Sequence, residues 1–198
     1  MLRVVDVEGE RRMATDSLGN STSRRQLSRA ALVARLKGVK LLSLDVDGVL
    51  TDGGLYYTND GQQLRKFNVK DGMGLQRVRA AGVEVALISA AKAPAILRRA
   101  ESLGLGYALV GCEDKLAGLA NICGELGLDL VDAAHMGDDL NDLTVLEAVG
   151  LPLSVPDAVP EVRAAAAYIT SRRGGDGAVR EICDLMVAAH GDGACRGA

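Results

Sequence analysis

The chain has 198 residues and a formal net charge of −3, with 23 Lys and Arg residues against 26 Asp and Glu residues. This length is typical of a single domain, and the charge balance excludes the strongly basic field with which proteins hold nucleic acids or anionic membranes. Hydrophobic residues make up 48% of the chain but aromatic residues only 3%, so we expect an aliphatic core. We therefore expect neither a nucleic acid nor a membrane as a partner.

The two ends of the chain differ in character from its centre. Residues 1–26 are polar and mixed in charge, which is typical of a disordered leader, and we expect residues 192–198 to form a flexible tail. One folded domain is then expected over residues 27–191. No signal peptide or spanning helix is expected, and the four dispersed cysteines indicate reduced thiols in a cytoplasmic protein.

Short apolar segments alternate with amphipathic ones along this domain. In chain order we expect a helix (29–37), a strand (41–46), a hairpin (55–69), a helix (71–81, with Asp71 as its N-cap), a strand (83–89), a helix (95–103), a strand (107–110), a helix (115–126), a strand (133–137), a helix (142–149), a strand (151–155), a helix (161–166), a strand (168–171) and a helix (178–189). The turn Asn59-Asp60-Gly61 is the signal for the hairpin. The alternation predicts an α/β fold, with a Rossmann-like parallel sheet between two helical layers and a protruding β-hairpin.

Polar residues gather where the expected strands end. In an open parallel sheet, ligands bind at the carboxyl ends of the strands, so separated segments converge on one edge. The residues in these positions are Asp45, Asp47, Ser89, Asp138, Asp139 and Asp142, with Lys115 following another strand.

The acidic pair Asp45 and Asp47 is the first of these clusters. A single Asp after a strand is most often a turn or cap residue, but residues two apart on a strand point the same way. Two carboxylates in that position are costly unless a cation compensates them. The helix dipole is enough to explain Asp142, whereas Asp138 is expected to face the acidic pair. Carboxylate oxygens are hard ligands, and a small number of them suits Mg²⁺.

Lys115 and Ser89 each allow two interpretations. A lysine is most often a solvated surface residue, and a serine after a strand is an ordinary helix cap. In a phosphate site, Lys115 would neutralise the phosphate and steady a nucleophilic carboxylate. Ser89 would donate its hydroxyl to a phosphate oxygen.

Taken in order, these segments resemble the four motifs of the haloacid dehalogenase superfamily. The finer resemblance is to its cap-less branch, the 3-deoxy-D-manno-octulosonate 8-phosphate phosphatases and relatives that act on nine-carbon ulosonate phosphates. The resemblance runs from about residue 31 to residue 191 and implies a phosphatase domain with no large cap domain. The matching segments are Asp45-x-Asp47-Gly48-Val49-Leu50-Thr51-Asp52-Gly53, Lys66-Phe67-Asn68-Val69-Lys70-Asp71-Gly72, Ser89, Lys115, Gly137-Asp138-Asp139-Leu140-Asn141-Asp142 and Arg173-Gly174-Gly175-Asp176-Gly177.

The resemblance implies a two-step reaction with distinct roles for the clustered residues. Asp45 would attack phosphorus to form an aspartyl-phosphate, and Asp47 would act first as acid and then as base. Mg²⁺ would be held by Asp45, the backbone carbonyl of Asp47 and Asp138. The supporting residues would be Asp139 and Asp142, and the phosphoryl group would contact Ser89, Gly48 and Lys115.

The resemblance also implies a homotetramer, in which the hairpin 55–67 of one subunit helps to close a neighbour's site and the segment 172–177 reaches toward an active site. Tyr56, Tyr57 and Phe67 are three of the five aromatic residues of the chain, and a short hairpin cannot bury them alone. The alternative is that they pack on the parent sheet.

The sequence departs from the branch after the strand 83–89. The branch usually reads Thr-Gly-Arg there, whereas this chain reads Ser89-Ala90-Ala91, so the hydroxyl is kept and a cationic donor is lost. Lys92, Arg65 and Arg173 are the candidates to replace that charge at a substrate carboxylate or phosphate. The branch relatives that act on nine-carbon acids tend to carry Glu at the position of Ala91.

Three functions follow from these observations. The leading one is Mg²⁺-dependent hydrolysis of a small phosphorylated sugar acid, 3-deoxy-D-manno-octulosonate 8-phosphate, in lipopolysaccharide biosynthesis. The alternative enzyme is a phosphatase for a nine-carbon, sialic-acid-like ulosonate 9-phosphate. The third is a catalytically weak tetrameric interaction module, which Ala90-Ala91 favours and the intact set of Asp45, Asp47, Lys115 and Asp138 opposes.

Overall fold

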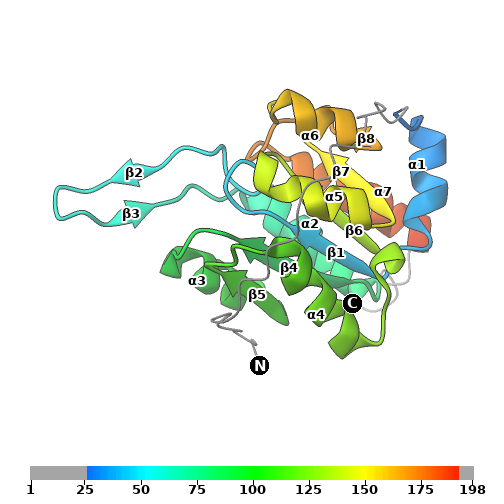
Figure 1. Cartoon of the computed structure of the whole chain (residues 1–198), viewed down its shortest axis with the longest axis horizontal. Coiled ribbons are helices and arrows are strands. Elements are labelled where there is room, and N and C mark those ends of the chain that lie inside the picture. The colour runs from blue at the N-terminus through cyan, green and yellow to red at the C-terminus, as the bar shows by residue number, and fades with distance from the viewer. Residues whose placement is uncertain (1–25, 192–198) are drawn as a thin grey trace, which may run out of the picture.

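The computed structural model describes residues 26–191 of the chain (Figure 1). The predicted tail, and the predicted leader apart from Gln26, lie outside the described residues. In residues 26–191, no helix is both long enough and apolar enough to cross a bilayer.

Six parallel strands form the central sheet, which confirms the predicted α/β fold. Their order across the sheet is β5-β4-β1-β6-β7-β8. The strands are β1 (Leu41–Leu44), β4 (Glu84–Ser89), β5 (Tyr107–Val110), β6 (Ala133–Gly137), β7 (Leu151–Ser154) and β8 (Tyr168–Ile169). In the register, Leu44 pairs with Leu87 of β4 and with Met136 of β6. Since β1 ends two residues earlier than predicted, Asp45 and Asp47 lie in the loop that follows it.

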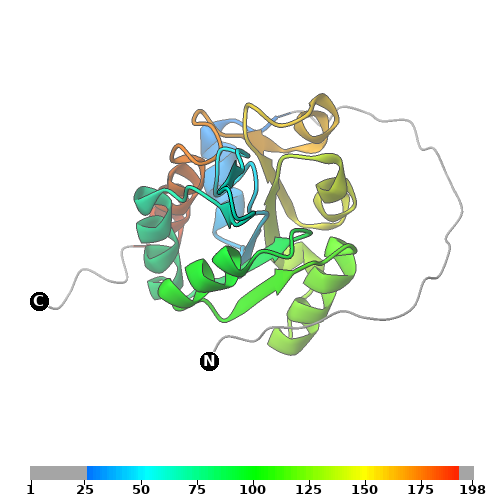
Figure 2. The ribbon, with the colours of Figure 1, turned by 90° about the vertical axis from the view of Figure 1, so that its left-hand side faces the viewer.

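Helices cover both faces of this sheet, as Figure 2 shows in a view turned by 90°. The helices are α1 (Arg29–Leu36), α2 (Val69–Ala80), α3 (Pro94–Ser102), α4 (Lys115–Leu126), α5 (Leu143–Ala148), α6 (Pro160–Ala165) and α7 (Ala178–His190). Residues of α1, α2, α3 and α7 share one hydrophobic cluster with Leu42 and Leu44, whereas residues of α4 and α5 share the other with Leu41. Successive strand residues thus face opposite layers, as a doubly covered sheet requires. The buried hydrophobic residues of the described region are all non-aromatic, which agrees with the predicted aliphatic core.

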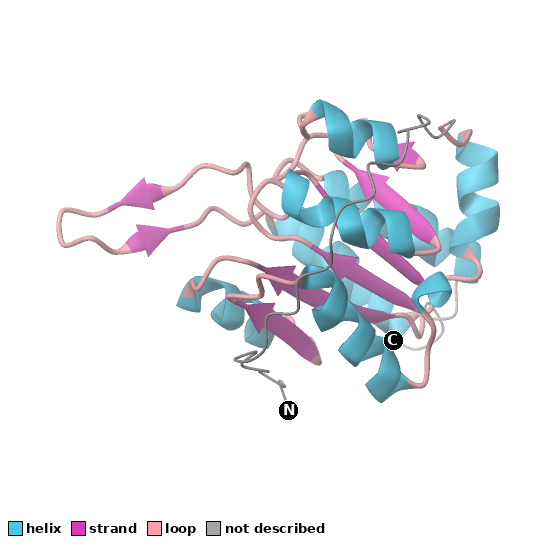
Figure 3. Ribbon diagram, viewed as in Figure 1, coloured by secondary structure: helices cyan, strands magenta, loops and turns pink. Residues whose placement is uncertain are grey.

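The predicted hairpin projects from the body of the protein between β1 and α2 (Figures 1 and 3). Its two short strands are β2 (Tyr56–Tyr57) and β3 (Gln63–Leu64), in which Tyr56 pairs with Leu64 and Tyr57 with Gln63. Tyr56 and Tyr57 are 54% and 63% exposed, so they do not pack on the parent sheet. Phe67, at the base of the hairpin, does pack against the core and lies beneath the guanidinium of Arg99 at 5.6 Å.

The N-cap predicted for α2 is wrong. Asn68 fills that position, because its side chain accepts a hydrogen bond from the amide of Lys70 at 2.9 Å. Asp71 lies in the first turn and accepts the amide of Arg180 at 2.7 Å, which ties α2 to α7. Burial, the main cause, raises the pKa of the Asp71 carboxyl. The sequence could not show this role, because Arg180 is distant along the chain.

The segment 172–177 packs against the loop after β1 of the same chain. The amide of Gly175 donates to the carbonyl of Val49 at 3.0 Å. A Cβ at Gly174 would lie 1.7 Å from the carbonyl oxygen of Gly48, so no larger residue fits there. The segment therefore packs against the loop that carries Asp45, within the same subunit.

We predict that Gly174→Ala destabilises the protein by about 1–3 kcal/mol, since the added methyl group forces the two loops apart. The matched control is Gly124→Ala within α4, where a Cβ would have nothing within 4 Å and where alanine favours the helix by about 0.5–1 kcal/mol. Urea unfolding of both variants measures this difference. Equal stability of the two variants would contradict the packing of these loops.

Candidate active site

The predicted site residues meet at one edge of the sheet. Asp45 directly follows β1, Ser89 ends β4 and Asp138 directly follows β6. The strands β4 and β6 are the two neighbours of β1, so all three residues come to the same carboxyl edge. Asp45 and Ser89 are buried, at 6% and 2% exposure.

The loop after β1 turns tightly beneath these residues. The carbonyl of Val46 accepts the amides of Val49, Leu50 and Thr51 at 2.9–3.3 Å. Gly48 has φ of +92°, and a Cβ there would lie 2.0 Å from Oδ2 of Asp138. Glycine is therefore needed both for the backbone conformation and for the approach of Asp138. The amide of Gly48 donates to the hydroxyl of Thr51 at 3.3 Å.

Lys115 is a buried cation and not a surface lysine. It is the first residue of α4, whose N-cap is Asp114, and its side chain is 0% exposed. Its Nζ lies 3.1 Å from Oδ1 of Asp45 and 2.6 Å from Oδ1 of Asp142. The ammonium thus joins the residue after β1 to the turn after β6.

A buried network that the sequence analysis missed continues from Asp142 into the sheet. His135 Nε2 lies 3.1 Å from Oδ1 of Asp142, and His135 Nδ1 lies 2.8 Å from the hydroxyl of Ser43. The other oxygen, Oδ2 of Asp142, accepts the amides of Asp138 and Asp139 at 3.1 and 3.4 Å. The available signal was one polar residue inside each of two apolar strands, Ser43 in β1 and His135 in β6, which the structure makes neighbours.

The four charged groups of this cluster hold their charges unequally. Burial, followed by the charge of Asp142, raises the pKa of Asp45 to about 6, although Lys115 opposes the shift. Burial and then the charges of Asp45 and Asp142 raise the pKa of Asp138 to about 8. Burial also acts to raise the pKa of Asp142, but His135 and Lys115 outweigh it and hold the pKa at about 2. Burial acts to lower the pKa of Lys115, but the charges of Asp45 and Asp142 outweigh it and leave the pKa above its ordinary value.

This arrangement fits a divalent cation. One carboxylate oxygen each from Asp45, Asp138 and Asp142 lies within 4.8 Å of the other two. Both oxygens of Asp142 are already bonded to protein groups, whereas Oδ1 of Asp138 is buried with no hydrogen-bond partner. A buried carboxylate oxygen with no donor, beside a second carboxylate, is the donor set that a small hard cation completes.

Asp47 pairs with Arg65, which follows β3 of the hairpin. Its two carboxylate oxygens accept hydrogen bonds from Nε and Nη2 of Arg65 at 2.8 and 2.9 Å. Asp47 is the more accessible partner, with 29% of its side chain exposed against 2% for Arg65. Both residues are candidate site residues by sequence, but their pairing was not predicted.

The remaining predicted residues lie around this centre with different surroundings. The hydroxyl of Ser89 accepts the amide of Ala91 at 3.2 Å, which is a local turn bond. The side chain of Lys92 lies along Gly111, after β5, and Arg173 is exposed within the segment 172–177. Asp139 caps the short turn Leu140–Asp142.

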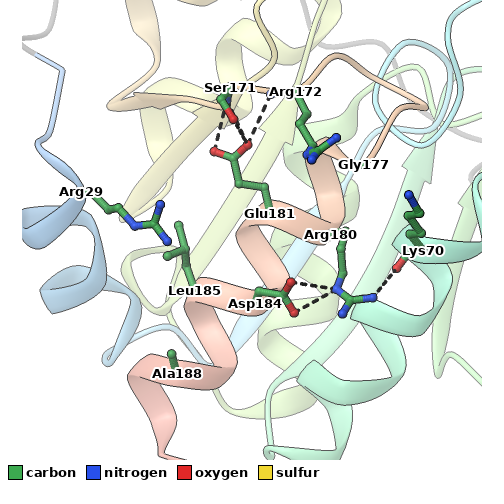
Figure 4. Close-up of a pocket in the computed structure, with 10 residues that line it drawn as sticks. All are labelled: Arg29, Lys70, Ser171, Arg172, Gly177, Arg180, Glu181, Asp184, Leu185 and Ala188. Atoms are coloured by element: carbon green, nitrogen blue, oxygen red, sulfur yellow. Dashed lines mark hydrogen bonds and ion pairs between the residues drawn. The ribbon is translucent and has the colours of Figure 1, made fainter.

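A separate surface pocket of about 600 Å³ lies between α1, α2 and α7 (Figure 4). Figure 4 shows its two carboxylates turned toward protein partners. Glu181 accepts the hydroxyl of Ser171 at 2.6 Å, and Asp184 accepts Nε of Arg180 through both oxygens at 2.9 Å. Both carboxylates of this pocket are thus engaged by protein groups, and none of the predicted site residues at the strand ends lines it. We therefore place the active site at the strand ends.

Comparison with known proteins agrees with this geometry. The haloacid dehalogenase-like hydrolase family matches residues 113–182. The 3-deoxy-D-manno-octulosonate 8-phosphate phosphatase KdsC of Escherichia coli K12 is 41% identical over 162 residues, which are 82% of this chain and 86% of that protein.

Solved structures extend the comparison. The Moraxella catarrhalis 3-deoxy-D-manno-octulosonate 8-phosphate phosphatase, in complex with magnesium, phosphate and KDO, superposes with a TM-score of 0.78 at 39% identity and covers 80% of this chain and 91% of that one. The cobalt-bound Haemophilus influenzae deoxy-D-mannose-octulosonate 8-phosphate phosphatase superposes with a TM-score of 0.76 at 34% identity, and the match covers 79% of this chain and 91% of that one. Within residues 26–191, the segment between β1 and α2 holds a hairpin and no cap domain. This chain therefore belongs to the haloacid dehalogenase superfamily, in its cap-less branch of 3-deoxy-D-manno-octulosonate 8-phosphate phosphatases.

Proposed function

We propose that the protein is a Mg²⁺-dependent phosphomonoesterase that hydrolyses 3-deoxy-D-manno-octulosonate 8-phosphate through a phosphorylated Asp45. The observation that carries this proposal is the buried Lys115, which holds Asp45 beside the unpartnered oxygen of Asp138. The named activity of relatives at about 40% identity supports the substrate.

The metal would be held by Asp45, Asp138 and the backbone carbonyl of Asp47, while Asp142 and Asp139 keep these ligands in place. When bound, Mg²⁺ neutralises the phosphate and makes phosphorus more electrophilic. Asp142 is a support and not a ligand, since the protein already satisfies both of its oxygens.

In the first step, an oxygen of Asp45 bonds to phosphorus as the bond from phosphorus to the sugar oxygen breaks. The departing oxygen takes the electron pair and receives a proton from Asp47. Lys115 fixes Oδ1 of Asp45 at 3.1 Å, which restricts the rotation of the nucleophile. Ser89, Lys115 and the loop at Gly48 then contact the phosphoryl oxygens.

In the second step, water attacks the phosphorus of the aspartyl-phosphate. Asp47 takes the proton from this water, and the bond from phosphorus to Asp45 breaks to release phosphate and the free carboxylate. Asp47 suits this part because its loop position is partly exposed, unlike that of Asp45.

The same proposal includes a homotetramer in which neighbouring subunits complete the sites. Leu55, Tyr56, Tyr57 and Leu64 are 43–63% exposed on the hairpin, and a projecting apolar hairpin of this kind is typical of a subunit contact. We also place the enzyme in the cytoplasm, in lipopolysaccharide biosynthesis. The free, buried thiols of Cys112, Cys123 and Cys183 agree with a reducing compartment.

Phosphate release from a panel of phosphomonoesters tests the activity. We predict that 3-deoxy-D-manno-octulosonate 8-phosphate is the best substrate, ahead of nine-carbon ulosonate 9-phosphates, and that activity requires Mg²⁺. Asp45→Asn removes the nucleophile and is expected to abolish release, while Asp60→Asn at the hairpin tip keeps it. The proposal fails if no ester in the panel is hydrolysed with any divalent metal.

Thermal unfolding tests the metal site. The pKa of Asp138 is raised, so without a cation its ionisation costs stability progressively as the pH rises from about 4 to about 8. At pH 8, a Mg²⁺ concentration of 100 times its Kd is expected to raise Tm by about 5–10 °C. The same concentration is expected to raise Tm by less at pH 5, because a proton on Asp138 then competes with the metal. Asp138→Asn is expected to remove most of this increase. An equal increase in wild type and variant would place the metal elsewhere.

Light scattering at micromolar concentration tests the assembly. We expect a tetramer for the wild type, and a smaller species for Tyr56→Lys/Tyr57→Lys, because charges in a buried hairpin contact are unpaired. A stable wild-type monomer would rule out shared sites.

A further inference from the structure

Both carboxylate oxygens of Asp47 are occupied by one guanidinium. Nε of Arg65 lies 2.8 Å from Oδ1, and Nη2 lies 2.9 Å from Oδ2. Only 2% of the Arg65 side chain is exposed, against 29% of the Asp47 side chain, so water reaches the pair mainly from the side of the carboxylate. A parallel, bidentate pair of this kind is among the strongest and most directional side-chain contacts.

This pair competes with the proposed role of Asp47 as acid and base. A leaving oxygen and an attacking water each need one oxygen of Asp47 within hydrogen-bond distance. A carboxylate oxygen can accept more than one donor, but the fork of Arg65 takes one acceptor site on each oxygen of Asp47 and holds the carboxylate in one orientation. We therefore expect Asp47 to meet either group in its best geometry only after Arg65 has moved.

The substrate itself offers the group that would draw Arg65 away. A carboxylate matches the guanidinium fork in the same bidentate geometry, and neither a hydroxyl nor an ammonium does. In an octulosonate 8-phosphate, the carboxylate lies at the end of the carbon chain opposite the phosphate. Arg65 would therefore leave Asp47, beside the phosphate, in order to reach it.

We propose that Arg65 is a specificity-determining switch, which passes from Asp47 to the carboxylate of a sugar-acid substrate and so frees Asp47 only when such a substrate is bound. The inference rests on the proposed function. It also explains how the site can lack the arginine that the branch usually has at the position of Ala91, since Arg65 supplies a positive charge from the hairpin.

Apart from Asp47, the side chain that the Arg65 guanidinium contacts belongs to the hairpin. Arg65 follows β3 at the base of the hairpin, outside the parallel sheet. Its Nη1 lies 3.4 Å from Gln63, whose amide donates to the hydroxyl of Tyr57 at 3.2 Å, both within the hairpin. The adjacent Lys66 pairs instead with Asp52, and 61% of its side chain is exposed. Lys66 is therefore the matched control for loss of a positive charge.

The test compares two esters with Arg65→Gln and Lys66→Gln. The first ester is 3-deoxy-D-manno-octulosonate 8-phosphate, and the second is a pentose 5-phosphate, which has no carboxylate. For Arg65→Gln, kcat/KM is expected to fall about 10- to 100-fold on the first ester and to rise on the second, because Asp47 is then free. Lys66→Gln is expected to match the wild type on both.

Two results would overturn the switch. An equal fall on both esters would show that Arg65 only supports the loop, and a fall on the first with no change on the second would show binding without release of Asp47. Calorimetric titration with unphosphorylated 3-deoxy-D-manno-octulosonate separates this inference from the proposed activity. Weaker binding by Arg65→Gln is expected even if no ester is hydrolysed, and unchanged binding would contradict the role of Arg65.

Discussion

The buried ammonium of Lys115 is the interaction on which the rest of the site depends. A charged group removed from water is costly unless it is paired and hydrogen-bonded, and here Asp45 and Asp142 both pair with it. Removing one partner of such a buried pair typically costs about 3–5 kcal/mol. The first residue of α4 thereby fixes the positions of the residues that follow β1 and β6. His135 and two backbone amides hold Asp142 from the other side.

One lysine does not balance the charge of this edge. Asp142 stays ionised, since its pKa is about 2, while the pKa values of Asp45 and Asp138 rise to about 6 and 8. Without a cation, the buried edge therefore disfavours two of its three carboxylates in their charged form. The fold positions Asp45 and leaves the remaining negative charge of this edge to be balanced by a ligand. The hairpin side of the site is different, because the charge of Asp47 is matched there by Arg65.

The sequence predicted the features that local patterns carry. Alternating apolar segments indicated the parallel sheet and its helical layers, and the order of the acidic motifs indicated that Asp45, Lys115 and Asp138 would meet. Distant side-chain contacts that involve residues outside these motifs were not predicted. Ser43 and His135 lie in different strands, and Asp71 contacts Arg180 across two helices. The pairing of Arg65 with Asp47 depends on how the hairpin leaves the body, which neither turn type nor propensity determines.

The most direct test of the account is to locate the phosphoryl group during turnover. The reaction of wild-type protein with 3-deoxy-D-manno-octulosonate 8-phosphate and Mg²⁺ would be quenched in acid within one turnover, digested and analysed by mass spectrometry. The account predicts a phosphorylated peptide whose modified residue is Asp45. A phosphoryl group on another residue, or turnover with no phosphorylated peptide at any quench time, would contradict the role assigned to Asp45 and to the lysine that holds it.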